Sequence, residues 1–270
     1  MKPNTVVNSR GLQGRTALVT GASSGLGAEF ARQLADMGCH LILTARRRGK
    51  LTDLKNEIHA RAKVDIAVLP ADLGTPDAPA ALYRQVQAAG LQVDVLVNNA
   101  GFGLHGPHMQ IPWDRERDML MLDVLALMQL TKLFAADMLK RNSGYILQVS
   151  SVGAYQPSPM YAAYSAIKSL VLMFGEALNY ELRNTGVGVT VLSPGVTATE
   201  FLQVAGQIPS RYQRLLMMQP HQVVAAGIKA MLKRRPSMIP GKLNAFLAWT
   251  TRLTPRRWAA AVAYRMMTID

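Results

Sequence analysis

The sequence predicts a single α/β domain built on a doubly wound parallel sheet. Six short apolar runs rich in β-branched residues alternate with five longer segments of helical periodicity. Each long segment can carry the chain across the sheet between two parallel strands. The chain has 270 residues, of which 49% are hydrophobic and 17% charged, so it can bury one substantial core.

The expected elements follow in order along the chain. The expected strands cover residues 16–20, 40–45, 66–71, 93–98, 144–150 and 187–193. The helices expected between them cover residues 27–37, 50–62, 76–89, 115–141 and 160–184. A further helix, 220–233, leads to a short run, 237–239, that is the candidate for a seventh strand. This alternation is typical of doubly wound sheets with helices on both faces.

The flanks of this pattern divide the chain into three expected parts. Residues 1–13 lack the apolar stretch of a secretory signal and are expected to form a flexible arm. Residues 14–241 form the α/β domain, and residues 242–270 form a basic amphipathic helical tail. A single cysteine, Cys39, rules out an internal disulfide and a multi-cysteine metal site. The sequence therefore predicts a soluble, cytoplasmic protein with no bound metal.

Positive charge is concentrated toward the C-terminus. The net charge is +13, and residues 201–270 hold eleven Lys or Arg against one acid. In the tail, apolar and aromatic residues are interleaved with arginines, which fits peripheral contact with an anionic membrane surface. A cap over a substrate pocket and a contact with a second subunit are the alternatives. Nucleic acid binding is not expected, because no nucleic-acid-binding motif accompanies the charge.

A glycine-rich turn joins the first expected strand to the first helix. Gly21, Gly25 and Gly27 are spaced G-x-x-x-G-x-G. Such a turn lets the backbone approach a pyrophosphate and directs the free N–H groups of the helix N-terminus at the phosphates. The turn therefore predicts dinucleotide binding, although its spacing differs from the common G-x-G-x-x-G pattern.

The end of the second strand indicates which dinucleotide is bound. An acidic residue here would accept a hydrogen bond from the adenosine ribose of NAD, whereas arginine accommodates the 2′-phosphate of NADP. The sequence at this corner is Ala45-Arg46-Arg47-Arg48, without an acid. We expect NADP, with Arg46 as the main contact and Arg47 as its helper. The alternative is a solvated basic loop.

Five motifs together resemble the short-chain dehydrogenase/reductase family. They are Thr20 to Gly27, Asn98-Asn99-Ala100-Gly101, Ser151, Tyr164-x-x-x-Lys168 and Pro194-Gly195. The resemblance covers roughly residues 14–241. It implies a Rossmann-type sheet of seven strands in the order 3-2-1-4-5-6-7 and a homodimer or homotetramer.

The resemblance also extends the expected cofactor site. It implies that Asp72 meets the adenine amine, that Asn98 braces the central strand, and that Thr199 approaches the carboxamide or pyrophosphate. The complete expected NADP-binding set is Gly21, Ser23, Ser24, Gly25, Leu26, Gly27, Arg46, Arg47, Asp72, Leu73, Asn99, Ala100, Gly101, Tyr164, Lys168, Pro194, Gly195, Val196 and Thr199.

Three residues are expected to carry the chemistry. Tyr164 and Lys168 are four apart on an expected helix, so their side chains share one face. A neighbouring ammonium favours the phenolate and lowers the pKa of Tyr164, which can then act as general acid or base. Ser151, at a strand end, can reach the same substrate oxygen. Tyr161 has Ser165, not lysine, four residues on. The alternative is an ordinary surface Tyr–Lys pair.

Asp123 stands where the family usually has an asparagine, in a pattern like N-V-x-A. In the family, that asparagine holds a water that links the lysine to solvent. Asp123 could keep this role, and a carboxylate near Lys168 would also stabilise the ammonium. The alternative is a helix aspartate that faces solvent.

Apolar residues around the expected site indicate the substrate. The candidate walls are Phe102, His105, Tyr155, Met160, Tyr161 and Leu202. They favour a hydrophobic ketone, aldehyde or alcohol as substrate for an NADP-dependent oxidoreductase. A catalytically impaired NADP-binding regulatory protein of the same fold is the alternative, and it would need only the glycine turn and Arg46.

Overall fold

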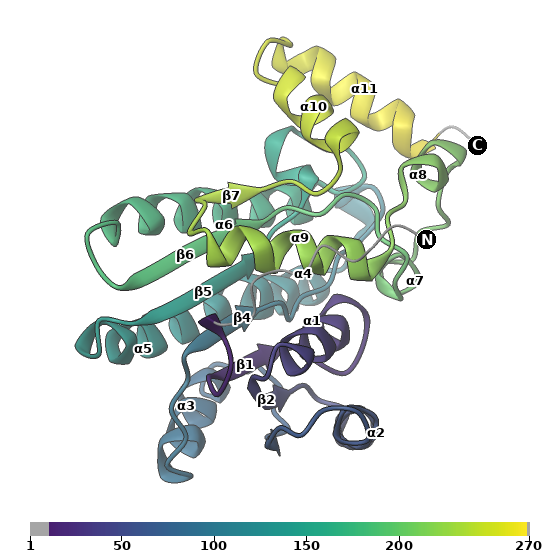
Figure 1. The fold of residues 1–270 in the computed structure, drawn as a ribbon. Coiled ribbons are helices and arrows are strands. Elements are labelled where there is room, and N and C mark those ends of the chain that lie inside the picture. Colours follow the sequence, from purple (N-terminus) through teal and green to yellow (C-terminus); the bar gives the residue numbers. More distant parts are fainter. Residues whose placement is uncertain (1–10, 269–270) are drawn as a thin grey trace, which may run out of the picture.

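A computed structural model describes residues 11–268 and contains the seven-stranded parallel sheet. The strands lie in the order β3-β2-β1-β4-β5-β6-β7 (Figure 1). Every neighbouring pair is parallel. The strands are β1 (Thr16–Thr20), β2 (His40–Thr44), β3 (Ile66–Val68), β4 (Val95–Asn98), β5 (Gly144–Val149), β6 (Val187–Leu192) and β7 (Ser237–Met238). The predicted strand order is confirmed.

Helices cover both faces of the sheet. One layer contains α1 (Gly25–Asp36), α2 (Arg48–His59) and α9 (Pro220–Leu232). The other contains α3 (Ala78–Ala88), α5 (Leu127–Lys140) and α6 (Ala162–Glu181). Because consecutive parallel strands are joined by these crossovers, all strands end at one edge of the sheet, where loops can assemble a site.

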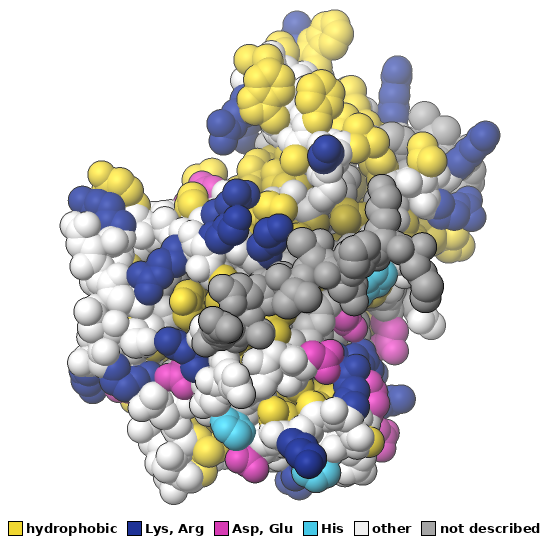
Figure 2. Space-filling model, viewed as in Figure 1, with side chains coloured by type: hydrophobic (Ala, Val, Ile, Leu, Met, Phe, Trp, Pro, Cys, Tyr) yellow, Lys and Arg dark blue, Asp and Glu magenta, His cyan; other side chains and the backbone are white. Residues whose placement is uncertain are grey.

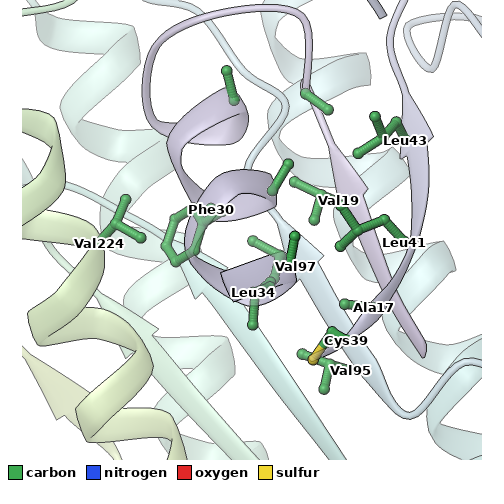
Figure 3. Packing of buried hydrophobic residues seen from close by; sticks show 14 of the residues in the cluster. Ala17, Val19, Phe30, Leu34, Cys39, Leu41, Leu43, Val95, Val97 and Val224 are labelled. Carbon is green, nitrogen blue, oxygen red and sulfur yellow. The ribbon is translucent and has the colours of Figure 1, made fainter. Parts of the chain in front are cut away.

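The core consists of apolar strand residues packed against the apolar faces of these helices. In Figure 3, Phe30 and Leu34 of α1 and Val224 of α9 lie against the β1 and β4 side chains Val19 and Val97. All five are buried. Burial on both faces explains why the strands read as continuous apolar runs without polar alternation.

The expected helix 115–141 is longer and less regular than predicted. It begins at Trp113 and consists of α4 (Trp113–Leu120), a π-helical turn η3 (Met121–Ala126) and α5. By length and composition, Trp113–Lys140 alone among the helices of residues 11–268 could cross a membrane, because an 18-residue window within it has a mean hydropathy of 1.6. Half of that apolar window is buried inside the protein, where Phe134 and Met138 belong to the core.

The C-terminal flank is helical as expected, whereas the N-terminal flank is partly packed into the core. The tail forms two helices, α10 (Lys242–Thr250) and α11 (Arg256–Thr268). Pro255 stands at the break, since proline lacks an N–H and disfavours helix at the residue before it. The expected arm, 1–13, mostly lies outside the described residues, but its Leu12 is fully buried and accepts a hydrogen bond from Cys39 Sγ at 3.3 Å. The core therefore begins before residue 14.

Short helical pieces gather beyond the carboxyl ends of the strands. They are η2 (His108–Gln110), η4 (Val152–Tyr155), α7 (Phe201–Ala205) and α8 (Arg211–Leu216). The last two lie in the long connection from β6 to α9, and α8 packs against α11. This edge of the sheet is where the expected site residues meet.

Candidate active site

A cavity of about 460 Å³ runs along the carboxyl edge of the sheet. Its walls come from the segments that follow β1, β2, β3, β4, β5 and β6. Its volume lies within the range of small-molecule and cofactor sites. One cavity thus contains most of the residues that the sequence singles out.

The glycine turn forms one end of the cavity. Gly21 and Gly25 have φ of +66° and +54°, a conformation that side chains disfavour. A Cβ on Gly27 would collide with the Gly21 carbonyl oxygen. Gly27 does not line the cavity; its missing side chain lets α1 approach the turn.

The start of α1 is open to an anion. Its first residue follows Ser24, whose side chain caps none of the helix N–H groups. Thr20 Oγ1 accepts hydrogen bonds from the backbone N–H groups of Asn99 and Ala100, both at 2.9 Å, and so holds the β4 loop against the turn. Free N–H groups at a helix N-terminus beside a backbone cradle fit a pyrophosphate.

The two arginines of the basic corner differ in their contacts within the protein. Arg47 donates to Ser24 Oγ at 2.8 Å and Ser23 Oγ at 3.1 Å, and its guanidinium lies 3.6 Å from a Glu200 carboxylate oxygen. Arg46 lines the cavity, is exposed, and makes no hydrogen bond or ion pair with the described residues. Arg47 therefore braces the glycine turn, while Arg46 is free to meet a ligand.

The remaining expected cofactor residues gather along the same cavity. Asp72 Oδ1 accepts the Gly74 N–H at 3.1 Å, which fixes the turn after β3. Asn98 faces away from the cavity and donates to Thr131 Oγ1 at 2.9 Å, bracing β4 against α5. The others that line the cavity are Leu73, Asn99, Ala100, Gly101, Pro194, Gly195, Val196 and Thr199.

Tyr164 and Lys168 project from α6 into the cavity next to Ser151. Lys168 Nζ lies 5.6 Å from the centroid of the Tyr164 ring, and the Ser151 hydroxyl is near enough to the phenol to lower its pKa. The neighbouring Ser150 donates instead to the Lys168 carbonyl oxygen at 2.7 Å. The Ser150 hydroxyl is thus engaged with α6, whereas Ser151 lines the cavity next to Tyr164.

Asp123 is buried against Lys168 rather than facing solvent. Its Oδ2 lies 2.9 Å from Lys168 Nζ, and its Oδ1 accepts the Phe102 N–H at 3.1 Å. The π-helical turn carries Asp123, and Gly101 leaves room for it, since a Cβ there would lie 2.6 Å from Oδ2. Lys168 also donates to the Val149 carbonyl oxygen at 3.3 Å. The lysine is therefore held by β5 and the π-helical turn together.

Burial dominates the electrostatics of this group. Burial raises the pKa of Tyr164, while the Lys168 ammonium and the Ser151 hydrogen bond lower it and Asp123 raises it. The effect of the Lys168 ammonium alone predicts a lowered pKa for Tyr164. Because burial outweighs that effect, the expected lowering is corrected to a raised pKa. Burial lowers the pKa of Lys168, but Asp123 and Tyr164 outweigh it, so the pKa is raised. Burial also raises the pKa of Asp123, and this effect outweighs the lowering by the Lys168 ammonium.

Half of the expected substrate walls meet the cavity. Phe102, Tyr161 and Leu202 line it. Tyr155, His105 and Met160 do not. Tyr155 packs against the cluster of Ala154, Leu172 and Val191 instead. The His105 and Tyr161 ring centroids lie 5.1 Å apart, and Met160 has a φ of +67°.

Sequence reasoning missed several residues of the cavity wall, three of which lie in the C-terminal part of the chain. Gln207, Gln213 and Met267 line the cavity, from the β6–α9 connection and from the end of α11. A glutamine within an irregular connection carries no periodic signal, and Met267 reaches the cavity only through the packing of α11 on α8. Ser210 Oγ donates to the Met266 carbonyl oxygen at 2.9 Å, which fixes the end of the tail there.

The opposite side of the tail is exposed. Figure 2 shows large apolar side chains and cationic side chains gathered on the part of the molecule formed by α10 and α11. The exposed apolar residues are Leu243, Phe246, Trp249, Leu253, Trp258, Val262 and Tyr264, and the exposed cations include Arg252, Arg256, Arg257 and Arg265.

Two curated relatives span most of the chain. A fruit fly protein, "Dehydrogenase/reductase SDR family protein 7-like" of Drosophila melanogaster, is 31% identical over 270 residues, covering 96% of this chain and 82% of that protein. The human very-long-chain 3-oxoacyl-CoA reductase is 31% identical over 198 residues, covering 71% of this chain and 62% of that protein.

Solved structures resemble the fold closely. A short-chain dehydrogenase from Sphingobium yanoikuyae in complex with NADPH is 28% identical with a TM-score of 0.78, covering 88% of this chain and 94% of that one. A short chain dehydrogenase/reductase from Burkholderia phymatum in complex with NAD is 26% identical with a TM-score of 0.78, covering 90% and 93%.

A family model described as short chain dehydrogenase matches residues 15–208. The matched segment begins just before β1 and includes the glycine turn, Ser151, Tyr164 and Lys168. Because the match spans more than half of the chain and agrees with the relatives, the chain belongs to the short-chain dehydrogenase family of oxidoreductases.

Proposed function

We propose that this chain is an NADP(H)-dependent oxidoreductase that interconverts a hydrophobic ketone or aldehyde and the corresponding alcohol. The observation that carries the proposal is that Ser151, Tyr164 and Lys168 share one cavity with an open helix N-terminus and with Arg46, which has no partner among the described side chains. The nicotinamide ring, when bound, supplies or accepts the hydride. A regulatory protein without catalysis would need only the glycine turn and Arg46. The presence of Ser151, Tyr164 and Lys168 together therefore favours an enzyme.

In the proposed mechanism, Tyr164 moves the proton. During reduction, Ser151 holds the substrate oxygen, and the Tyr164 hydroxyl donates its proton to that oxygen as the carbonyl carbon becomes an alcohol carbon. In oxidation the phenolate takes the proton from the alcohol. Because burial raises the pKa of Tyr164, the phenol is protonated at neutral pH, and reduction should weaken only on the alkaline side.

Asp123 is proposed to keep Lys168 charged beside the phenol. The Asp123 carboxylate raises the pKa of Lys168 and compensates the burial of its ammonium. The ammonium in turn stabilises the Tyr164 phenolate that proton donation leaves behind. Asp123 does not touch the substrate in this proposal; it acts through Lys168 as a positioning residue.

The basic corner supports NADP over NAD. No carboxylate stands at the end of β2, and Arg46 has no partner among residues 11–268. A guanidinium can meet a doubly charged phosphate with paired hydrogen bonds. Similar structures are described with either NADPH or NAD, so the preference rests on this corner.

Apolar walls support a hydrophobic substrate. Phe102, Phe201, Leu202 and Val204 line the cavity, and the Phe201 ring lies 5.5 Å from the Tyr164 ring. The human relative is named as a reductase of very-long-chain 3-oxoacyl-CoA, which is consistent with an apolar carbonyl compound. We propose a cytoplasmic homodimer or homotetramer; exposed apolar residues on α6, such as Leu170 and Met173, are candidates for a subunit contact.

The exposed side of the tail is proposed to contact an anionic membrane surface. Trp249 and Trp258 are both more than half exposed, and exposed arginines flank them. Aromatic rings with adjacent cations fit the interface of an anionic bilayer. Met267 on the inner side lines the cavity, so the tail serves as part of the pocket wall as well.

Replacing Tyr164 with phenylalanine tests the proton transfer. Tyr164→Phe keeps the ring but removes the hydroxyl, so turnover should fall at least about a hundredfold, the usual scale of a general acid, with NADPH binding nearly unchanged. Stopped-flow and steady-state assays of NADPH absorbance measure this. Tyr180→Phe, the same change at an exposed site on α6, should behave like the parent. Near-parental turnover in Tyr164→Phe would remove the mechanism.

Arg46→Ala tests the cofactor preference. The parent should bind NADPH at least about tenfold more tightly than NADH, since only NADPH carries the phosphate that Arg46 pairs. Arg46→Ala should lose most of this discrimination, while NADH affinity stays unchanged. Arg48→Ala, which removes the same charge outside the cavity, is the control. If titration by fluorescence finds equal discrimination in Arg46→Ala and the parent, the corner is only a solvated loop.

Asp123→Asn tests the buried ion pair. The change removes the partner of a buried ammonium and should lower the free energy of unfolding by about 3 kcal/mol. Asp118→Asn, on the exposed side of α4, should change it by less than about 0.5 kcal/mol. Urea unfolding followed by tryptophan fluorescence compares them. Equal stability of the two variants would mean that Lys168 does not depend on Asp123.

Vesicle cosedimentation tests the tail. The protein should bind anionic vesicles at 0.1 M salt and dissociate at 1 M, because the Debye length shrinks from about 10 Å to about 3 Å. Arg256→Gln/Arg257→Gln should weaken binding, at about 1 kcal/mol for each cation. Arg48→Gln/Arg84→Gln removes the same amount of charge from α2 and α3 and should leave vesicle binding unchanged. A parent protein that ignores anionic vesicles at low salt contradicts the proposal.

A further inference from the structure

A buried glutamine in the cavity wall has a hydrogen-bonding capacity that the proposed mechanism does not use. Gln207 lines the cavity and is only 5% exposed. Its Oε1 accepts a hydrogen bond from the Tyr161 hydroxyl at 2.7 Å. Its Nε2 is buried and has no hydrogen-bond partner among the described residues. A buried donor without a partner is costly, which suggests that a ligand satisfies it.

The local backbone fixes where this side chain lies. Helix α7 ends at Gly206, whose φ of +76° is the left-handed conformation that glycine adopts readily. The Gln207 N–H bonds the Leu202 carbonyl oxygen at 2.9 Å, and the Gly206 N–H bonds that of Gln203 at 3.1 Å. These two bonds form a Schellman turn, which ends the helix and sets the direction of the next residue.

Tyr161 fixes which side of the amide is free. It precedes Tyr164 by three residues, and the two rings lie 5.5 Å apart, so Gln207 is tied to the catalytic helix through Tyr161. The phenol donates its proton to Oε1, which leaves the NH2 group unpaired. Gln207 can therefore offer its unpaired N–H donors to a ligand.

A second glutamine in the same wall is used in the same way. Gln213 Oε1 accepts the Ser210 N–H at 3.0 Å, and the Gln213 N–H bonds Ser210 Oγ at 3.2 Å. This reciprocal capping box engages the amide oxygen of Gln213, and the hydrogen bonds among the described side chains do not involve its NH2 group. Both amides of this wall thus present nitrogen, not oxygen, as their unused group.

The surroundings of Gln207 are neutral. The cations that line the cavity are Arg46, Arg47 and Lys168, which belong to the basic corner and to the ion pair with Asp123. Burial raises the pKa of Tyr161, and burial lowers the pKa of the His105 imidazole packed on it, so both are uncharged at neutral pH. A carboxylate ligand would find no counter-charge beside Gln207, whereas a neutral acceptor oxygen would be accommodated.

We propose that the Gln207 amide is a specificity-determining hydrogen-bond donor for a second, neutral acceptor oxygen on the substrate. The proposal rests on the proposed oxidoreductase function and narrows its substrate class. The substrate is an apolar carbonyl compound that carries an ester, thioester or ketone oxygen in addition to the oxygen that reacts at Tyr164. A plain hydrocarbon ketone would leave the Gln207 donor unsatisfied on binding.

The test compares ligands that differ only in the second oxygen. The probes are octan-2-one and a series of methyl keto-esters of similar length, in which the ester carbonyl is moved stepwise away from the ketone. Binding is measured by calorimetry on NADPH-loaded protein with Tyr164→Phe, so that the ligand is not consumed. At least one keto-ester should bind about tenfold more tightly than octan-2-one, the gain expected from satisfying one buried donor.

Two substitutions at Gln207 separate the donor from the rest of the side chain. Gln207→Glu, assayed at a pH where the introduced carboxyl is ionised, keeps an acceptor for Tyr161 but removes the donor, and Gln207→Leu removes both at any pH. Each should reduce the keto-ester preference to about one. Gln203→Leu, at an exposed position on α7 outside this cavity, should keep the tenfold preference. Unchanged NADPH affinity in Gln207→Glu and Gln207→Leu verifies that the fold is intact.

The outcomes distinguish this proposal from the function on which it rests. A preference in Gln207→Glu equal to that in Gln203→Leu overturns the assignment, as does a parent that prefers no member of the series. If the parent shows the preference in binding but reduces none of the ketones, the oxidoreductase proposal fails and the assignment of Gln207 stands. Reduction of octan-2-one and the keto-esters with equal efficiency overturns only the assignment.

Discussion

The buried contact between Lys168 and Asp123 joins the parts of the protein that the site requires. Lys168 Nζ lies 2.9 Å from Asp123 Oδ2 and also reaches the Val149 carbonyl oxygen, so α6, the π-helical turn and the end of β5 share one charged group. Two unpaired charges at this depth would be strongly unfavourable, so each depends on the other. The same carboxylate holds the Phe102 N–H, which ties the loop after β4 to this group. Asp123, the carboxylate that contacts the lysine, lies in the π-helical turn. Such turns tend to occur at functional sites.

Close backbone packing sets the other end of the cavity. The glycine turn approaches the β4 loop so closely that side chains at Gly21 or Gly27 would collide with backbone atoms. Arg47 anchors this turn through Ser23 and Ser24, which leaves Arg46 as the cation available to a ligand. Charge is therefore separated along the cavity, with free positive charge near the turn and a neutralised pair beside Tyr164.

The wall opposite the sheet comes from segments that are only partly helical. The β6–α9 connection contributes apolar side chains and two glutamines, and α11 closes the wall with Met267. Short helices ended by Gly206 and started by Ser210 hold these residues through local hydrogen bonds rather than through the core. Such a wall can vary in sequence without disturbing the sheet, which is the usual division between scaffold and specificity in this architecture.

The sequence by itself determined the alternation of strands and helices, the glycine turn and the pairing of Tyr164 with Lys168, because these depend on local periodicity, spacing and backbone conformation. The strand order was implied by the family resemblance. The sequence also raised Asp123 as a partner of Lys168 but left a solvent-facing aspartate open. Only the tertiary structure decided that Asp123 is buried on the lysine, that burial raises the pKa of Tyr164, and that Tyr155 turns away from the cavity while Gln207 and Met267 enter it. These outcomes depend on which segments distant in the chain pack together and on how much water they exclude, and neither property is encoded in the spacing of neighbouring residues.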